Sequence, residues 1–431
     1  MSIIRIGQSG PLKGEVEVSG SKNAVLPLLA ATLLTEEACE ITDVPDLKDV
    51  DVMCRLLRSF GAVVEEDKGG KSIKVRAKTL TSNEAPCGLV KKMRASVLAM
   101  GPLLARTGRA KVSLPGGCAI GKRPIDLHLK GFRALGADIV SMEDEENYGY
   151  VEAVTSELKG VEIYLDTRSV GATENIIMAA ALSRGVTLIE NAAQEPEIVD
   201  LANFLNKMGA KIKGAGTDVV KIEGVERLHG ANHTVIPDRI EAATFLLAAA
   251  VTKGDITVTN MLSDHVKPVI AKLRECGVTV EDGANETRVY ASGDRMLTAT
   301  DIKTLPYPGF PTDVQPQFMA FLATASGSGV IRETVFENRF GHVPELNKMN
   351  AGVTLAREGR EAIVPGGRIL RGAKVRATDL RAGAALILAG LAAEAETEIS
   401  DVYHIDRGYS NIIEKFSSLG ADIKRLPHTA K

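Results

Sequence analysis

The 431-residue sequence is poor in the residues that staple small proteins or bind metals. It has no tryptophan, aromatic residues make up 4% of it, and its five cysteines are an odd number. They include no C-x-x-C pair, so neither a disulfide framework nor a zinc site is indicated. The seven histidines show no metal-ligand spacing, which predicts no metal. No P-loop and no dinucleotide-binding glycine fingerprint occurs, so no ATP or NAD cofactor is expected.

Long apolar runs and a strong net charge are also missing. The longest apolar stretches, AATFLLAAAV and AGAALILAGLAA, fall far short of the roughly 20 residues that cross a bilayer. The N-terminal sequence lacks the apolar segment of a secretory signal. A net charge of -3 gives no support for non-specific nucleic-acid binding. We therefore expect a cytoplasmic protein with no membrane or nucleic-acid partner, present as a monomer or weak oligomer.

What the sequence does contain is an internal repeat. A similar short phrase recurs roughly every 70 residues, as RSFGAVV, RALGADI, NKMGAKI, RECGVTV, NKMNAGV and SSLGADI. The residues at the equivalent position are Gly61, Gly136, Gly209, Gly277, Asn350 and Gly420. Glycine and asparagine both tolerate the left-handed backbone that ends a helix. Each phrase is therefore predicted to close an amphipathic helix.

Each repeat also contains a second, more apolar helix. It begins about forty residues before the closing phrase, and a short β-branched run separates the two helices. The unit thus reads as strand, helix, strand, helix and one or two strands. Helices that are apolar on every side must lie inside the protein. We predict an α/β (α+β) fold of six βαβαββ units with buried parallel helices.

The stretch HGANHTVIPDR, near residues 229–239, is the best internal boundary because it falls between the third and fourth repeats. At 431 residues the chain exceeds what one hydrophobic core usually serves. We expect an N-terminal domain of residues 22–232 and a C-terminal domain of residues 1–21 plus 233–431. The opening strand should complete the C-terminal domain.

Positive residues stand where the six apolar helices begin. Lys22, Arg94, Arg239 and Arg381 oppose the partial positive charge of a helix N-terminus. Such a local conflict is expected at a functional site. At two other starts, Asp313 and Asp379 are equally well explained as helix caps and as functional carboxylates.

The loop LPGGCAIGKRPIDLH in the second repeat places Cys118 at its tip, followed by the candidate cations Lys122, Arg123 and His128. A thiol among cations ionises readily and is reactive. The other cysteines in apolar stretches, Cys39, Cys54 and Cys276, are expected in the core. Corresponding loops in the last two repeats hold Arg339 and His342, and His404, Asp406 and Arg407. This combination suggests anionic substrates and acid–base chemistry.

These residues lie in motifs that resemble one known family. SGSKNA, LPGGCAIGKRPIDLH, LDTRSVGATEN, NAAQEPEIVD, FPTDVQ, ETVFENRFGHVPEL, ATDLRA and YHIDRGY are similar to the UDP-N-acetylglucosamine 1-carboxyvinyltransferases over nearly the whole chain. The resemblance implies a two-domain inside-out α/β barrel with its active site in the cleft between the domains. It also implies transfer of the enolpyruvyl group of phosphoenolpyruvate to the 3′-hydroxyl of UDP-N-acetylglucosamine. No metal or organic cofactor is implied.

The resemblance also implies residue roles. Cys118 matches the cysteine that protonates the methylene carbon and forms a phosphothioketal adduct, and Asp313 the carboxylate that binds the sugar hydroxyl. Lys22, Arg123 and Arg407 match the cations that hold phosphoenolpyruvate. Asp379 and Arg381 match cleft residues that support the reacting centre. The matches to nucleotide-sugar contacts are Asn23, Arg94, Arg123, Pro124, Ile125, Asp126, Leu127, Ser169, Val170, Gly171 and Val335.

One departure and three alternatives stay open. Some members have a lysine where this chain has Thr167, followed by Arg168. The sister family acting on shikimate 3-phosphate shares the leading lysine but not the cysteine loop. The RNA 3′-phosphate cyclases should show a catalytic histidine and nucleotide dependence. A repeat scaffold should carry equivalent residues in every copy, whereas here the helix starts differ.

Overall fold

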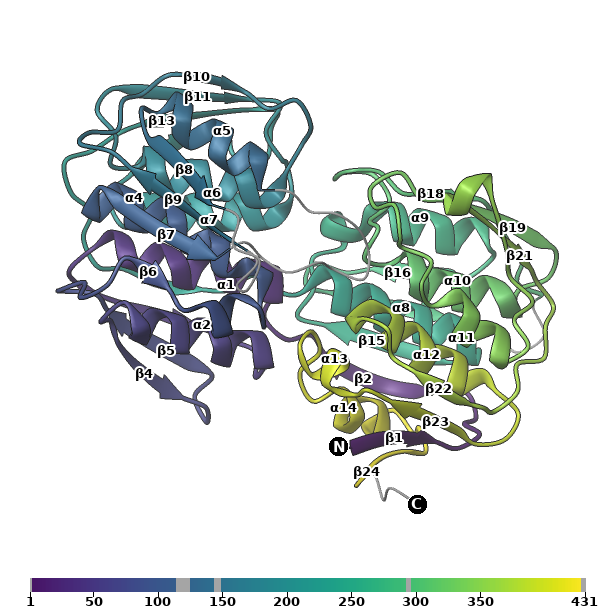
Figure 1. Cartoon of the computed structure of the whole chain (residues 1–431). Coiled ribbons are helices and arrows are strands. Elements are labelled where there is room, and N and C mark those ends of the chain that lie inside the picture. The colour runs from purple at the N-terminus through teal and green to yellow at the C-terminus, as the bar shows by residue number, and fades with distance from the viewer. Residues whose placement is uncertain (1, 114–124, 143–148, 292–295, 428–431) are drawn as a thin grey trace. The chain divides into compact units, whose positions relative to one another are not determined.

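The structure is a computed structural model, and it describes residues 2–113, 125–142, 149–291 and 296–427. The chain forms two compact units (Figure 1). The N-terminal unit comprises the described residues of 20–236, and the C-terminal unit those of 2–19 and 237–427. The N-terminal unit passes the predicted boundary at residue 232 because strand β14 (Asn232–Thr234) pairs in parallel with β3 (Ala38–Thr42).

Each unit has three four-stranded sheets with one shared topology. In every sheet the first strand runs parallel to the second, and the other pairs are antiparallel. In the N-terminal unit the remaining strands of the sheets are β5 (Ser72–Arg76) and β4 (Val63–Asp67); β6 (Glu84–Ala85), β7 (Arg109–Ser113), β9 (Tyr150–Val154) and β8 (Asp138–Met142); and β10 (Glu162–Tyr164), β11 (Val186–Glu190), β13 (Val219–Glu223) and β12 (Lys211–Lys213).

The C-terminal unit repeats this arrangement with strands from both ends of the chain. Its sheets are β2 (Lys13–Glu17), β15 (Asp255–Thr259), β17 (Glu286–Tyr290) and β16 (Thr279–Asp282); β18 (Ile302–Lys303), β19 (Ser328–Arg332), β21 (Glu361–Pro365) and β20 (Thr354–Ala356); and β22 (Lys374–Arg376), β23 (Thr397–Ser400), β1 (Ser2–Ile6) and β24 (Ile423–Pro427). Strand β1 lies between β23 and β24, and β2 pairs with β15. The opening segment therefore completes two sheets of this unit, as the sequence indicated.

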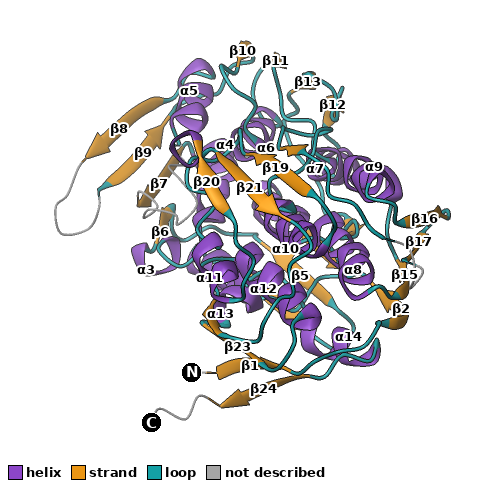
Figure 2. Cartoon of the chain, turned by 90° about the vertical axis from the view of Figure 1, so that its right-hand side faces the viewer, coloured by secondary structure: helices purple, strands orange, loops and turns teal. Residues whose placement is uncertain are grey.

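The apolar helices lie inside the sheets, which confirms the predicted α/β fold with buried helices. Figure 2 shows the sheet of β19, β20 and β21 in front of α10. Nearly every residue of these helices is buried. They are α1 (Lys22–Ala31), α4 (Met100–Thr107) with the 3₁₀ turn η2 (Arg94–Ala99) before it, α6 (Val170–Ala180), α8 (Arg239–Thr252), α10 (Gln315–Thr324) and α12 (Leu380–Ala392).

The second helix of each repeat is amphipathic and closes at the predicted residue. These helices are α2 (Lys48–Ser59), α5 (Asp126–Ala134), α7 (Pro196–Lys207), α9 (Lys267–Glu275), α11 (Val343–Lys348) and α14 (Ile412–Ser418). The residue after each has a positive φ, between 91° and 101° at the five glycines and 70° at Asn350. The interpretation of Asn350 as a substitute for glycine is confirmed.

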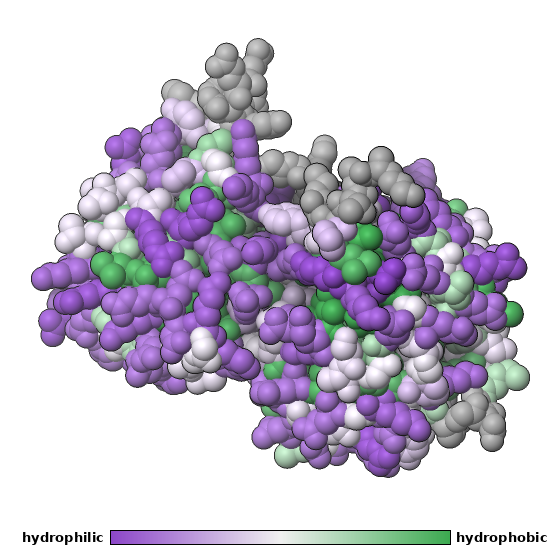
Figure 3. Space-filling view, turned by 90° about the horizontal axis from the view of Figure 1, so that it is seen from below, coloured by the Kyte–Doolittle hydropathy of each residue, from purple (hydrophilic) through white to green (hydrophobic). Residues whose placement is uncertain are grey.

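The covering of the apolar helices leaves a polar exterior. Figure 3 shows hydrophilic side chains over most of the face that it draws, with small hydrophobic patches between them. Within the described part of the chain, no helix is both long enough and apolar enough to cross a membrane.

Replacing Gly420 by alanine should destabilise the protein by about 1–2 kcal/mol, because its φ of 96° disfavours any residue with a Cβ. A Cβ at Gly420 would meet no atom within 4 Å, so backbone strain alone is tested. Gly10→Ala is the matched control, since it has the same open space and no positive φ. Thermal unfolding should show a lower Tm for Gly420→Ala only; equal Tm values for both variants would contradict the strain argument.

Candidate active site

The C-terminal unit contains a cluster of two arginines and two aspartates. Arg339 donates from Nη2 to Oδ1 of Asp313 at 3.3 Å and from Nη1 to Oδ1 of Asp379 at 3.4 Å. Arg381 donates from Nε and Nη2 to Oδ2 of Asp313 at 3.3 and 3.2 Å. Both arginine side chains are 1% exposed, whereas that of Asp313 is 27% exposed. The buried cations therefore hold a carboxylate that solvent can reach.

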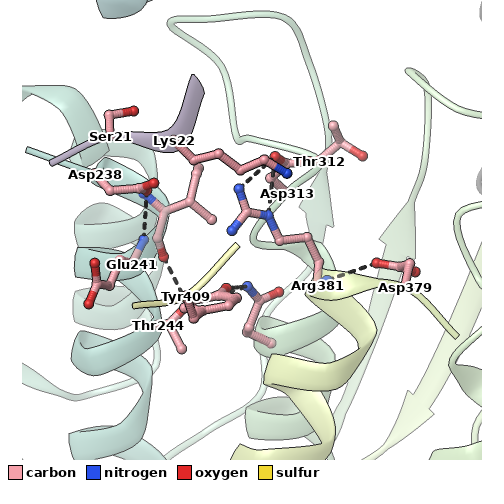
Figure 4. Close-up of polar contacts among 12 residues, drawn as sticks. Ser21, Lys22, Asp238, Glu241, Thr244, Thr312, Asp313, Asp379, Arg381 and Tyr409 are labelled. Atoms are coloured by element: carbon pink, nitrogen blue, oxygen red, sulfur yellow. Dashed lines mark hydrogen bonds and ion pairs between the residues drawn. The ribbon is translucent and has the colours of Figure 1, made fainter. Parts of the chain in front are cut away.

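The starts of the buried helices explain this arrangement (Figure 4). Asp379 caps α12, because its Oδ1 accepts from the N–H groups of Arg381 and Ala382 at 2.8 and 3.1 Å. Asp313 does not cap α10, whose N-cap is Val314 without a side-chain bond. Of the two alternatives for each aspartate, the cap is thus correct for Asp379 and wrong for Asp313, which forms ion pairs instead.

The other side of Arg381 faces a polar group in the helix core. Its guanidinium lies over the ring of Tyr409, 5.4 Å from the centroid. The Tyr409 hydroxyl contacts Thr244 Oγ1 on α8 and accepts from Nε2 of Gln317 on α10, each at 3.1 Å (Figure 4). Since Arg381 begins α12, this network joins all three buried helices of the unit directly below the cluster.

Arg407 follows the short helix α13 (Tyr403–Asp406) and lies near the cluster. Burial and then the charge of Arg407 lower the pKa of His404, while Asp379 acts in the opposite direction. These mutual effects place Arg407 and Asp379 around one histidine. Asp406, which the sequence indicated as a spare carboxylate, forms a two-point ion pair with Arg425 on β24.

Val335 lies on the loop after β19, and its side chain is exposed. Its N–H donates to Oε1 of the buried Glu333 at 2.8 Å. The carbonyl and side chain of Val335 are therefore the groups left to meet a ligand.

In the N-terminal unit, Lys22 at the first turn of α1 is paired rather than solvated. Its Nζ lies 2.8 Å from Oδ2 of Asp49 on α2, and both side chains are buried. Ser21 caps the helix by accepting from the N–H of Ala24, and Asn23 beside Lys22 is partly exposed. The ion pair offsets the conflict between a lysine and the helix dipole.

A buried histidine joins the segments predicted to bind the nucleotide sugar. His128 on α5 accepts at Nδ1 from Nδ2 of Asn175 on α6, at 2.9 Å. The orientation of Asn175 is set because its Oδ1 accepts from Gly101 N–H and its Nδ2 also donates to Val97 O, each at 2.8 Å. The proton of neutral His128 is therefore on Nε2.

This histidine corrects one expectation. Burial, and then the charge of Arg94, lower the pKa of His128 to about 4, so it does not add to the cations as predicted. Instead it packs against Gly171, where a Cβ would lie 3.2 Å from its Cε1. Three segments with predicted site residues meet around it, and those residues are Arg94; Ile125, Asp126 and Leu127; and Ser169, Val170 and Gly171.

Three predicted site residues, Cys118, Arg123 and Pro124, lie outside the described residues. The prediction that Cys39, Cys54 and Cys276 belong to the core is confirmed, since all three are buried. Burial raises the pKa of Cys54 and that of Cys276 to about 12, so both thiols stay protonated.

The described residues offer charge and hydrogen bonds rather than a metal site. Within that part of the chain, no group of three or more His, Cys, Asp or Glu side chains is placed to hold a metal ion. The sequence assigned no role to Arg339, Asp49 or Asn175, although each completes a site contact. Arg339 lies in a quoted motif, whereas Asp49 in the first turn of α2 reads as an ordinary helix-dipole partner.

Comparison with known proteins agrees with this geometry. The model of the EPSP synthase (3-phosphoshikimate 1-carboxyvinyltransferase) family matches residues 6–416. The UDP-N-acetylglucosamine 1-carboxyvinyltransferase 1 of Caldanaerobacter subterraneus subsp. tengcongensis is 59% identical over 97% of this chain and 98% of its own. The corresponding protein of Finegoldia magna is 54% identical over 99% of both chains. The chain belongs to the UDP-N-acetylglucosamine 1-carboxyvinyltransferases, within the EPSP synthase family.

Solved structures extend the likeness of this carboxyvinyltransferase. The enolpyruvyl transferase NikO from Streptomyces tendae has a TM-score of 0.88 at 28% identity, covering 98% of both chains. An EPSP synthase from Acinetobacter baumannii has a TM-score of 0.76 at 20% identity, covering 99% of this chain and all of that one. The second likeness shows the shared fold alone.

The neutral His128 should make this carboxyvinyltransferase sensitive to acid. Because the folded pKa of about 4 lies below the ordinary 6.5, its contribution is complete above pH 6.5 and is lost as the pH falls toward 4. The expected loss at pH 4.5 is roughly 2–3 kcal/mol. His128→Gln, whose amide oxygen can still accept from Asn175, should show a smaller fall in unfolding free energy between pH 8 and pH 4.5.

The comparison must be with the wild-type protein, because other groups titrate too. Burial raises the pKa of Glu174 well above its usual value and gives the opposite trend, and burial lowers the pKa of His342 to about 4. The exposed His229→Gln is the control. Identical pH slopes for His128→Gln and wild type would contradict a buried neutral His128.

Proposed function

We propose that this chain transfers the enolpyruvyl group of phosphoenolpyruvate to the 3′-hydroxyl of UDP-N-acetylglucosamine and releases phosphate. The observation that carries the proposal is the 59% identity over nearly the whole length to a relative named for this reaction. The reaction begins peptidoglycan precursor synthesis, and we place it in the cytoplasm. Residues of both units contribute, and the enzyme acts as a monomer or weak oligomer without an added cofactor.

The proposed reaction is an addition followed by an elimination. The sugar oxygen bonds to C2 of phosphoenolpyruvate while the Cys118 thiol gives a proton to the methylene carbon. A proton then leaves the new methyl group, the double bond re-forms and phosphate departs. In the covalent form, the sulfur of Cys118 bonds to the same C2 and gives the phosphothioketal adduct.

The proposed role of Asp313 is to bind and orient the attacking hydroxyl. The two guanidinium groups favour its ionised form, which can accept that hydroxyl. Its 27% exposed side chain can be reached, unlike those of its partners. The same cations disfavour lasting proton uptake, so we assign Asp313 orientation first and proton acceptance only during the step in which the hydroxyl adds.

The proposed anion-binding residues are Lys22, Arg123 and Arg407, with Arg381 and Asp379 supporting the reacting centre. Nη1 of Arg381 is buried and has no hydrogen-bond partner among the described residues, so the guanidinium keeps one donor for an anionic ligand. Cations held in a dry site stabilise developing charge strongly. For the nucleotide sugar we propose the segments around His128, which supply Arg94, Ile125, Asp126, Leu127, Ser169, Val170 and Gly171, together with Asn23, Arg123, Pro124 and Val335.

Phosphate release distinguishes this function from that of the sister family. With phosphoenolpyruvate present, the enzyme should release phosphate with UDP-N-acetylglucosamine and not with shikimate 3-phosphate. Product mass should rise by one enolpyruvyl group per nucleotide sugar. Turnover with shikimate 3-phosphate alone would overturn the proposal.

The role of Cys118 can be tested by alkylation. An epoxide phosphonate, which resembles phosphoenolpyruvate, should add once to the intact protein, and peptide mapping should locate it on Cys118. The half-buried Cys87 is an internal control. Cys118→Ser should lose turnover yet bind UDP-N-acetylglucosamine in calorimetry; an adduct on another cysteine, or full turnover by the variant, would refute the assignment.

A further inference from the structure

Glu333, the residue directly after β19, is a buried carboxylate with four hydrogen-bond donors around it. Its side chain accepts at Oε1 from Thr304 Oγ1 at 2.7 Å and from the N–H groups of Val335 and Phe336 at 2.8 and 3.2 Å. Oε2 accepts from Thr312 Oγ1 at 2.9 Å. The residue is 3% exposed, and none of these partners is a cation.

Such a site is costly unless every acceptor is satisfied. Taking a carboxylate out of water without a cation requires several donors in compensation. Here two hydroxyls and two backbone N–H groups supply them, and they come from three different loops. A structural role needs no particular loops, so which segments are joined is the informative point.

Two of the joined segments carry proposed site residues. Thr312 directly precedes Asp313, and Val335 is itself a proposed nucleotide-sugar contact. The carbonyl of Thr312 also accepts from Nε of Arg339 at 3.3 Å. Both polar groups of Thr312 are therefore held, one by Glu333 and one by the arginine that binds Asp313. This fixes the backbone from which the Asp313 side chain projects.

The bonds that hold Asp313 itself are long, between 3.2 and 3.3 Å. They tolerate small displacements of the carboxylate, so backbone placement matters for its direction. A misplacement of about 1 Å at a reacting group can cost roughly a hundredfold in rate. Glu333 lies beyond contact with the reacting atoms yet controls this placement.

We propose that Glu333 is a positioning residue that sets Asp313 and Val335 in one geometry for the acceptor sugar. One oxygen holds the Asp313 segment through the Thr312 hydroxyl, and the other holds the Val335 segment through its N–H. The inference rests on the proposed function, because it assumes that these two segments meet the nucleotide sugar.

The test removes the link without removing the carboxylate. Thr312→Val lacks the hydroxyl that Glu333 accepts from, and Thr312→Ser retains it. Thr252→Val is the matched control: in the same unit it loses a buried hydroxyl that donates to Ala248 O at 2.8 Å. Glu333→Gln probes both links at similar volume, and Tm is measured for every variant.

Thr312→Val should lower kcat roughly tenfold, with a Tm change like that of Thr252→Val, and Thr312→Ser should restore kcat. Glu333→Gln should lower kcat and also raise KM for UDP-N-acetylglucosamine, since both segments are affected. Thr252→Val should leave kcat unchanged. A merely structural Glu333 predicts equal Tm losses with kcat within twofold of wild type in Thr312→Val, and this result would overturn the proposal. Wild-type protein inactive toward UDP-N-acetylglucosamine would instead refute the proposed function.

Discussion

The burial of helices that have no polar face is the constraint on which the rest of the structure depends. α8, α10 and α12 are apolar around their whole circumference, so each must be enclosed by sheets and by the other two. Only their ends can carry polar groups without a large desolvation cost. Charged residues therefore collect at the helix starts, where orphan N–H groups and loops supply partners.

The two units satisfy this constraint with different chemistry. In the C-terminal unit the buried groups are ionic, and Arg339 and Arg381 are neutralised by Asp313 and Asp379. In the N-terminal unit the centre of the convergence is a neutral imidazole, held by an amide with all its bonds directed. The first arrangement suits charge redistribution in a reaction, and the second suits the shaping of a binding surface without adding charge.

The same fold serves more than one acceptor. An EPSP synthase shares it at 20% identity, so the sheets and buried helices do not determine which substrate is bound. The distinction lies in loops at the helix starts, such as the one that ends at Asp313 and the one that carries Val335. Glu333 connects these two loops, which places acceptor recognition in the loops and stability in the repeated frame.

The sequence by itself determined the repeated frame. The closing residues from Gly61 to Gly420 could be located because helix period and left-handed backbone are local properties, and even Asn350 followed from them. The apolar helices and the contribution of the first strand were also predictable, since hydrophobic pattern is a local signal.

Only the tertiary structure decided the partners. That Lys22 pairs with Asp49, that Asp313 binds two arginines instead of capping α10, and that His128 is neutral all depend on residues distant in sequence. The strand β14 crossed the expected boundary for the same reason, because its partner β3 is nearly two hundred residues away along the chain (His233 pairs with Ile41). Desolvation and hydrogen-bond geometry act between such segments, and no periodicity in the sequence records them.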